Sequence, residues 1–148
     1  MENLQFQFKG FKILRSLIEK KEGNPSQFLI EFEPSGAINK KDSCFQLFLK
    51  VLIEDKKKVF KVEITSMASF HFSNKIEKKQ LNNLFYINAP AMLFPYLRAY
   101  ISTLTNLSGY DPVNLPTLNI SSLGKKLEEN TKEINKVSPV KKQNANKK

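Results

Sequence analysis

The residues of this chain that could carry enzyme chemistry are few. The chain has one histidine, His71, and one cysteine, Cys44. His71 alternates with the apolar residues Phe70 and Phe72, so we expect it to face solvent. Cys44 precedes an apolar segment, where a small packed residue is the better interpretation than a nucleophile. No nucleophile and base stand at a recognisable motif spacing, so we predict that the protein is not an enzyme.

The sequence also predicts no metal ion and no cofactor. A single histidine and a single cysteine cannot supply the ligands of a structural zinc site, and one cysteine cannot form an internal disulfide. The five glycines form no phosphate-binding loop. The function must therefore be sought in surfaces rather than in reactive groups.

Positive charge is the first property of the surface that needs an explanation. The formal net charge is +10, from 24 Lys and Arg against 14 Asp and Glu. A basic nucleic-acid-binding protein is therefore an alternative of another class. However, Arg15 and Arg98 are the only arginines, and base readout favours arginine over lysine. Half of the excess charge also lies in residues 125–148. We therefore do not expect nucleic acid as a partner.

The chain of 148 residues fits one domain. We assign this domain to residues 1–137 and predict a disordered basic tail at 138–148, which holds lysine and asparagine but no aromatic residue. The N-terminus lacks the basic and apolar regions of a signal peptide. Prolines and asparagines interrupt the uncharged stretch 80–97, so we expect no membrane span and a cytoplasmic location.

Four segments before residue 75 alternate in polarity as half-buried strands do: 6–13, 27–33, 45–53 and 60–72. The first slips register at Gly10, which indicates a bulge. The second is expected to stop at the turn signal of residues 34–36, Pro-Ser-Gly. The polar residues 55–57 predict a tight reversal between the last two. Such short connections favour an antiparallel sheet.

Two helices should follow the strands. Asn88 is a candidate cap for the first helix, with Pro90 in its first turn and Gly109 after its end. The second should begin at Asn119 or Ser121 and run to about residue 136. We therefore predict an α+β fold, with a four-stranded antiparallel sheet covered on one face by two helices.

Two strings in the helical half are distinctive. Residues 88–98 read NAPAMLFPYLR, and residues 109–120 read GYDPVNLPTLNI. They resemble the SecB export-chaperone family, in which Leu-Phe-Pro-Tyr-x-Arg opens the first long helix, Gly-Phe-Pro-Pro follows it, and Pro-x-x-Asn-Phe opens the second helix. The resemblance covers residues 4 to about 130.

The resemblance implies an ATP-independent holdase chaperone. Such a protein binds unfolded preproteins in apolar grooves and keeps them competent for export by the Sec translocase. The partners implied are the unfolded preproteins, the export motor ATPase, and further copies of the chain in a homotetramer built as a dimer of dimers. An alternative with the same fold is a specialised SecB-like chaperone for one client, such as an antitoxin.

The resemblance also suggests residues for each role. The candidates for binding unfolded polypeptide are Phe70, Phe72, Tyr86, Tyr110, Ile120 and Leu123, for each of which packing in the core is the alternative. The candidates for the oligomer interface are Leu93, Tyr100, Ile101 and Leu104, which could instead pack on the sheet. For Arg98 we favour a structural salt bridge or a helix cap over an interface role.

The chain departs from the family pattern at three points. The connection at residues 20–26 is short for the loop that forms part of the groove wall, and Ile120 stands where the family usually has Phe. Familiar members present carboxylates on the exposed sheet face to meet the motor. Here Lys50 and Lys61 accompany the four glutamates expected on that face, which are Glu31, Glu33, Glu54 and Glu63. The charge pattern therefore weakens the expectation of docking to the motor.

Overall fold

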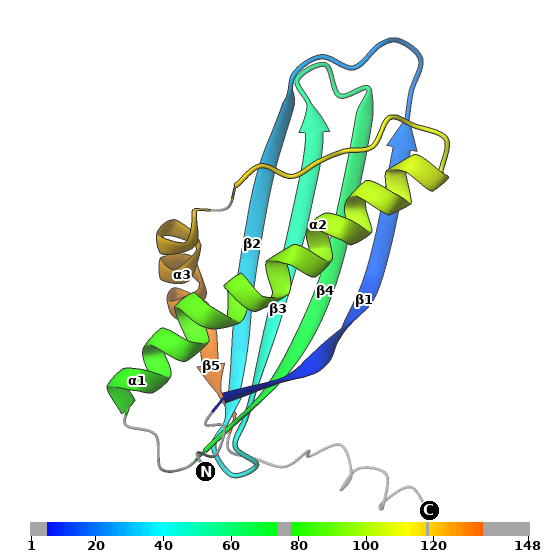
Figure 1. Ribbon diagram of the computed structural model, residues 1–148. Helices are drawn as coiled ribbons and strands as arrows, with labels where there is room; N and C mark the ends of the chain where they lie inside the picture. The colour runs from blue at the N-terminus through cyan, green and yellow to red at the C-terminus, as the bar shows by residue number, and fades with distance from the viewer. Residues whose placement is uncertain (1–5, 74–77, 118, 135–148) are drawn as a thin grey trace, which may run out of the picture.

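A computed structural model describes residues 6–73, 78–117 and 119–134. The central feature is a twisted sheet (Figure 1) of five strands in the order β1-β4-β3-β2-β5. The strands are β1 (Phe6–Lys20), β2 (Phe28–Asn39), β3 (Cys44–Asp55), β4 (Phe60–Phe72) and β5 (Thr131–Glu133). The first four pair antiparallel, and β5 pairs parallel to β2.

The helical segments lie on one face of this sheet. They are α1 (Lys78–Asn83), a π-helical turn η1 (Leu84–Asn88), α2 (Ala89–Leu107) and α3 (Ile120–Glu129). In Figure 1, α2 crosses the sheet diagonally, the extended stretch after it returns across the same face, and α3 lies beside β2. The predicted α+β class with helices on one face is confirmed, and the fifth strand adds to the predicted four.

The core lies between α2 and the two central strands. Alternate residues of β3 and β4 are fully buried, as period-two strands with one covered face require. Leu93, Leu97 and Ile101 of α2 meet them from above and are also fully buried. These three residues follow the spacing of four that places side chains on one helical face. Burial of apolar area from both layers is therefore the main stabilising term.

Of two predictions about the strands, the structure confirms one and contradicts the other. The bulge expected at Gly10 is confirmed, because the β1–β4 register shifts between Phe8 and Phe11 and Gly10 has φ +108°. The expected end of the second strand is wrong, because β2 continues through Pro34, which pairs with Leu49, to Asn39. Proline lacks an N–H to donate, and a strand at the side of a sheet tolerates it where no ladder bond is required.

The helix boundaries also differ from those expected. Asn88 is not a cap: it has helical angles and makes no side-chain cap bond, because η1 runs directly into α2. The second helix does begin after Asn119, whose side-chain oxygen accepts a hydrogen bond from the Ser122 N–H. It ends at Glu129 instead of about residue 136, since the chain turns at Asn130 into β5. The predicted tail at 138–148 lies outside the described residues.

Asp55 ties the short loop after β1 to the β3–β4 hairpin. Its buried carboxylate accepts hydrogen bonds from the N–H groups of Ser26, Lys57, Val59 and Phe60 and from the Ser26 hydroxyl. Burial alone would raise the pKa of this carboxyl group, but the hydrogen bonds to Phe60, Ser26 and Val59 outweigh it and hold the pKa well below its usual range. The ionised side chain thus organises one end of the sheet.

Asp55→Asn should lower the thermal midpoint, because an amide cannot accept hydrogen bonds from all these donors and leaves some of them buried and unpaired. The folded-state pKa is depressed, so the stabilisation by Asp55 is complete above the unfolded pKa of about 4 and is lost as the pH falls below it. Thermal unfolding between pH 7 and pH 2.5 should therefore show a shallower acid loss in the variant. Asp111→Asn, at an exposed carboxylate, is the control. Equal acid profiles for Asp55→Asn and the unaltered protein would contradict this account.

Candidate functional site

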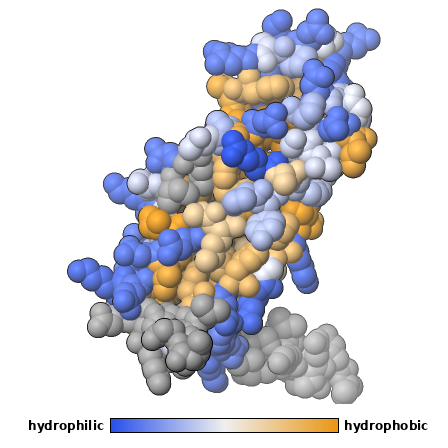
Figure 2. Space-filling model, in the orientation of Figure 1, coloured by the Kyte–Doolittle hydropathy of each residue, from blue (hydrophilic) through white to orange (hydrophobic). Residues whose placement is uncertain are grey.

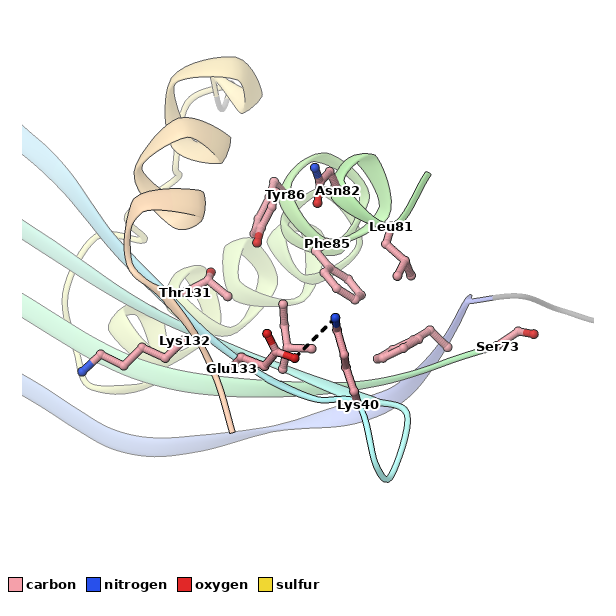
Figure 3. A pocket seen from close by; sticks show the side chains of 11 residues that line it. Lys40, Ser73, Leu81, Asn82, Phe85, Tyr86, Thr131, Lys132 and Glu133 are labelled. Atoms are coloured by element: carbon pink, nitrogen blue, oxygen red, sulfur yellow. Dashed lines mark ion pairs between the residues drawn. The ribbon is translucent and has the colours of Figure 1, made fainter. Parts of the chain in front are cut away.

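Two apolar grooves on the helix-bearing side are the main candidates for a binding site. We call the first the aromatic groove. It has a volume of about 490 Å³ and lies between the end of β2, the segment α1–η1 and β5. It is lined by Ile38, Lys40, Phe72, Ser73, Leu81, Asn82, Phe85, Tyr86, Thr131, Lys132 and Glu133. Figure 3 shows Phe85 and Leu81 projecting from the helical segment toward the strands, where Lys40 and Glu133 form an ion pair.

Phe85 organises the floor of the aromatic groove. Its ring stacks on Phe45 with a centroid distance of 4.3 Å, and it meets Phe72 edge-on at 5.2 Å. Tyr86 lies beside it, half-buried, and its hydroxyl hydrogen-bonds the side chain of Thr131. Burial, opposed in part by this bond, raises the pKa of the Tyr86 hydroxyl, so Tyr86 remains neutral and can act as an amphipathic contact.

The second groove lies at the opposite end of β2, under the stretch that follows α2. We call it the loop groove. It has a volume of about 450 Å³ and is lined by Lys20, Pro25, Phe28, Ile30, Phe60, Gly109, Tyr110, Asp111, Pro112, Val113 and Asn114. Tyr110 packs edge-on against Phe60 at 4.9 Å and stays half-buried. Gly109, with φ +99°, lets the chain reverse after α2 and brings Tyr110 to this position.

A smaller hollow of about 340 Å³ between β2 and α3 extends the loop groove along the strand. Ile30 lines both, and Leu123 and Lys126 of α3 form the other wall of the hollow. Figure 2 shows apolar surface on this face of the molecule in patches between hydrophilic ends. The grooves therefore follow β2, where α2 no longer covers the sheet.

The structure divides the predicted polypeptide-binding residues between the two grooves and the core. Phe72 and Tyr86 lie in the aromatic groove and Tyr110 in the loop groove. Phe70 is fully buried in the core, while Phe72 and Leu123 keep 4% of their surface exposed. Ile120 begins α3, but its side chain lies outside the described residues. The candidates thus do not form one continuous patch in this conformation.

Sequence reasoning missed Phe85 and β5. Phe85 is 2% exposed, yet its ring contacts the rings of Phe6, Phe45, Phe72 and Tyr86. Its position directly before Tyr86 was the available signal, because a pair of aromatic residues in a helical segment can place one ring in the core and the next at its rim. Nothing in the polar residues 131–133 marks them as a strand.

The predicted interface residues split in a similar way. Leu93 and Ile101 are fully buried between α2 and the sheet, which is the packing alternative. Tyr100 and Leu104 are half-buried, and the Tyr100 hydroxyl hydrogen-bonds the Ser16 hydroxyl at 2.7 Å. The apolar residues that α2 exposes are instead Met92, Tyr96 and Leu107, the last with 80% of its surface free.

Arg98 has a structural position. Its Nε donates a hydrogen bond to the carbonyl oxygen of Leu115 at 3.0 Å, and its guanidinium carbon lies 5.9 Å from the centre of the Phe94 ring. The expected salt bridge or helix cap is thus replaced by a bond to the extended stretch after α2. Arg98 therefore holds the strip of chain that covers the loop groove.

The outer face of the sheet carries paired charges. Glu63 lies within 2.8 Å of Arg15, 3.4 Å of Lys50 and 4.0 Å of Lys61, measured between charged atoms. Lys50 also approaches Glu33 at 3.9 Å. Although these side chains are partly exposed, so that each pair contributes little stability, the neighbouring cations reduce the negative potential of the face.

The described residues offer little for other chemistry. They contain no group of three or more potential metal ligands, and no helix among them is long and apolar enough to cross a membrane. His71 is exposed, as predicted. Burial, with a smaller effect from the Asp42 carboxylate, raises the pKa of the Cys44 thiol, which makes it a poor nucleophile. The apolar lining of the two grooves can hold apolar groups of a polymer or of a small molecule.

This architecture, with helices on one face of an antiparallel sheet and open apolar grooves along one strand, is that of a binding protein. The model of the family described as "Preprotein translocase subunit SecB" matches residues 16–131, so the chain belongs to the SecB family. This is a family of chaperones and not of enzymes.

Individual relatives agree with this assignment. The chain is 33% identical over 89 residues to "Protein-export protein SecB" of Jannaschia sp. (strain CCS1), covering 55% of this chain and 52% of that protein. The chain thus spans about half the length of such curated relatives. A longer match, to "Protein-export protein SecB" of Magnetococcus marinus, is 27% identical over 121 residues and covers 74% of this chain and 76% of that protein.

The fold is similar to that of a solved structure. "Mycobacterium tuberculosis Rv1957 SecB-like chaperone in complex with a ChAD peptide from Rv1956 HigA1 antitoxin" superposes with a TM-score of 0.65 at 19% identity. The superposition covers 78% of this chain and 88% of that chain. At this identity the similarity concerns the fold.

The packing of α3 against η1 depends on a close contact at Gly124. A Cβ atom there would lie 2.6 Å from the Tyr86 carbonyl oxygen. Gly124→Ala should therefore loosen α3 from η1, although alanine favours a helix by about 1 kcal/mol. We expect a lower thermal midpoint and faster amide hydrogen exchange in residues 120–129. Ser121→Ala, at an exposed position of α3, should not lower the midpoint. A midpoint raised equally in both variants would contradict the contact.

Proposed function

We propose that the protein is an ATP-independent holdase chaperone that binds unfolded preproteins and keeps them competent for export. The observation that carries the proposal is the pair of aromatic-lined grooves at the two ends of β2, in a chain of the SecB family. An unfolded preprotein exposes apolar side chains along an extended chain. Separate apolar subsites on one surface suit such a ligand, since hydrophobic contact is non-directional and weak contacts add up along the polymer.

The half-buried tyrosines are the best candidates for direct contact. Tyr86 and Tyr110 present ring surface at the rims of the aromatic and loop grooves. Phe72 also lines the aromatic groove and would support its floor, whereas Phe70 would act through the core and Leu123 through the hollow between β2 and α3. Tyrosine suits varied clients, because its ring offers apolar area and its hydroxyl can bond exposed backbone groups.

Tyr86→Ala and Tyr110→Ala should each weaken the binding of an unfolded secretory precursor about tenfold, or about 1.4 kcal/mol, while the thermal midpoint changes little. Binding can be followed by anisotropy of the labelled precursor, and function by suppression of its aggregation in light scattering. Leu14→Ala is the control, because it removes an exposed apolar side chain of β1 that lines neither groove. Loss of affinity in all three variants, or in none, would contradict the assignment of the grooves.

We infer further that the chain works in the cytoplasm as a homotetramer, a dimer of dimers, and passes clients to the export motor ATPase. The exposed apolar face of α2, with Met92, Tyr96 and Leu107, supports assembly through this helix. Tyr100 and Leu104 would flank it, while Leu93 and Ile101 hold the helix on the sheet. The paired charges of the outer sheet face favour a motor contact of balanced rather than strongly acidic character.

Leu107→Lys should shift the assembly toward smaller species, because a buried ammonium group is costly at an apolar interface. The mass in solution, measured by size exclusion with light scattering over a concentration series, should fall for this variant. Ser121→Lys adds the same charge at an exposed position of α3 and should leave the mass unchanged. An unaltered mass in both variants would contradict assembly through α2.

A further inference from the structure

The short strand β5 occupies the outer edge of β2 with few contacts of its own. In the part of the chain that the structure describes, it pairs with three residues, Gly36, Ala37 and Ile38, whereas β3 pairs with the whole length of β2. The bonds at its two ends join the Gly36 N–H to the Asn130 carbonyl oxygen at 3.2 Å and the Ile134 N–H to the Ile38 carbonyl oxygen at 2.7 Å. Its last two side chains, Lys132 and Glu133, are exposed. Main-chain pairing therefore supplies most of its attachment.

The side chains of β5 make polar rather than apolar contacts at this edge. Thr131 lies over Gly36, where an added Cβ atom would be 2.8 Å from the Thr131 hydroxyl oxygen and 3.0 Å from the Phe45 ring. A polar hydroxyl thus borders the aromatic stack of Phe45 and Phe85, and it turns to the carbonyl of Leu127 and to Tyr86. Among the described residues, Glu133 forms an ion pair with Lys40 at 3.4 Å, and both side chains are exposed (Figure 3).

We propose that the outer edge of β2 at residues 36–38 is a strand-pairing site for an extended client segment, and that β5 covers this edge until the client replaces it. The inference rests on the proposed holdase function and adds how the client is held. β5 itself shows that this edge can pair with a strand whose side chains are polar. A free edge needs a partner for its N–H and C=O groups, and an unfolded chain can provide one of any sequence.

The occupant that fits is an extended polypeptide with apolar residues at alternate positions. Because alternate side chains point to opposite faces, residues at the places of Thr131 and Glu133 would enter the aromatic groove. The residue between them, at the place of Lys132, would direct its backbone groups to β2, as the bonds of Asn130 and Ile134 indicate. Such a client matches β5 in main-chain bonds and adds apolar contact with Phe85 and Tyr86.

A reversible disulfide between β2 and β5 tests whether the client must replace β5 to bind. Ala37 and Lys132 are register partners, and neighbouring strands lie close enough for a disulfide. The full chain with Ala37→Cys and Lys132→Cys, in a Cys44→Ser background, should bind the labelled unfolded precursor at least tenfold more weakly when oxidised than when reduced. The Cys44→Ser protein alone should be insensitive to oxidation. Equal affinity of the locked and reduced forms would overturn the proposal.

Uncovering the edge should have the opposite effect. Lys132→Pro removes a ladder donor from β5 and should strengthen binding several-fold, whereas Lys132→Ala, which also removes the charge, should not. If Lys132→Pro caused the protein to self-associate through the edge and did not improve client binding, the occupant would be a second copy, and the proposal would be overturned.

Modified peptides test the main-chain pairing directly. The probe is a labelled peptide of alternating Phe and Ser. N-methylation of the Ser amides, which face β2 when Phe enters the groove, should reduce affinity at least tenfold, and N-methylation of the Phe amides should have a small effect. Equal effects would overturn strand pairing. A reduced, unlocked protein that bound no unfolded precursor at all would instead contradict the holdase function itself.

Discussion

The burial of one face of the β3–β4 hairpin under α2 is the interaction on which the rest of the structure depends. Alternate residues of both strands are fully buried, and Leu93, Leu97 and Ile101 close the layer from above. A helix of 19 residues is about 28 Å long and covers a narrow strip of a sheet. Its diagonal course leaves the β2 side uncovered at both ends. The grooves therefore result from incomplete coverage of an apolar sheet face.

Individual hydrogen bonds and close contacts then shape the sheet surface at these uncovered ends. Asp55 fastens the short loop after β1 beside the loop groove, and Arg98 holds the extended stretch that covers it. At the other end, the π-helical turn carries Phe85 into the core and leaves Tyr86 at the rim. Gly124 allows α3 to approach this turn closely. Each of these features positions an aromatic side chain at a border between core and solvent, where a polypeptide could reach it.

Much of this arrangement could be predicted from local pattern. The alternation of β3 and β4, the bulge at Gly10, and the end of α2 before Gly109 follow from period, glycine conformation and spacing. The failures have a common origin. Residues 34–36 carry a turn signal that pairing with β3 overrides, and Asn88 loses its expected cap role because a helical segment precedes it. In both places the neighbouring structure outweighs local propensity.

The sequence by itself determined the fold class, the covered face of the sheet and the resemblance to the SecB family, because the period of apolar residues and the motif strings are local properties. Only the tertiary structure decided which aromatic residues are core and which are rim. It also decided that residues 131–133 form a strand, since three polar residues become β5 only where the edge of β2 offers unpaired backbone groups. Pairing between residues far apart in the chain leaves no periodic trace in so short a segment.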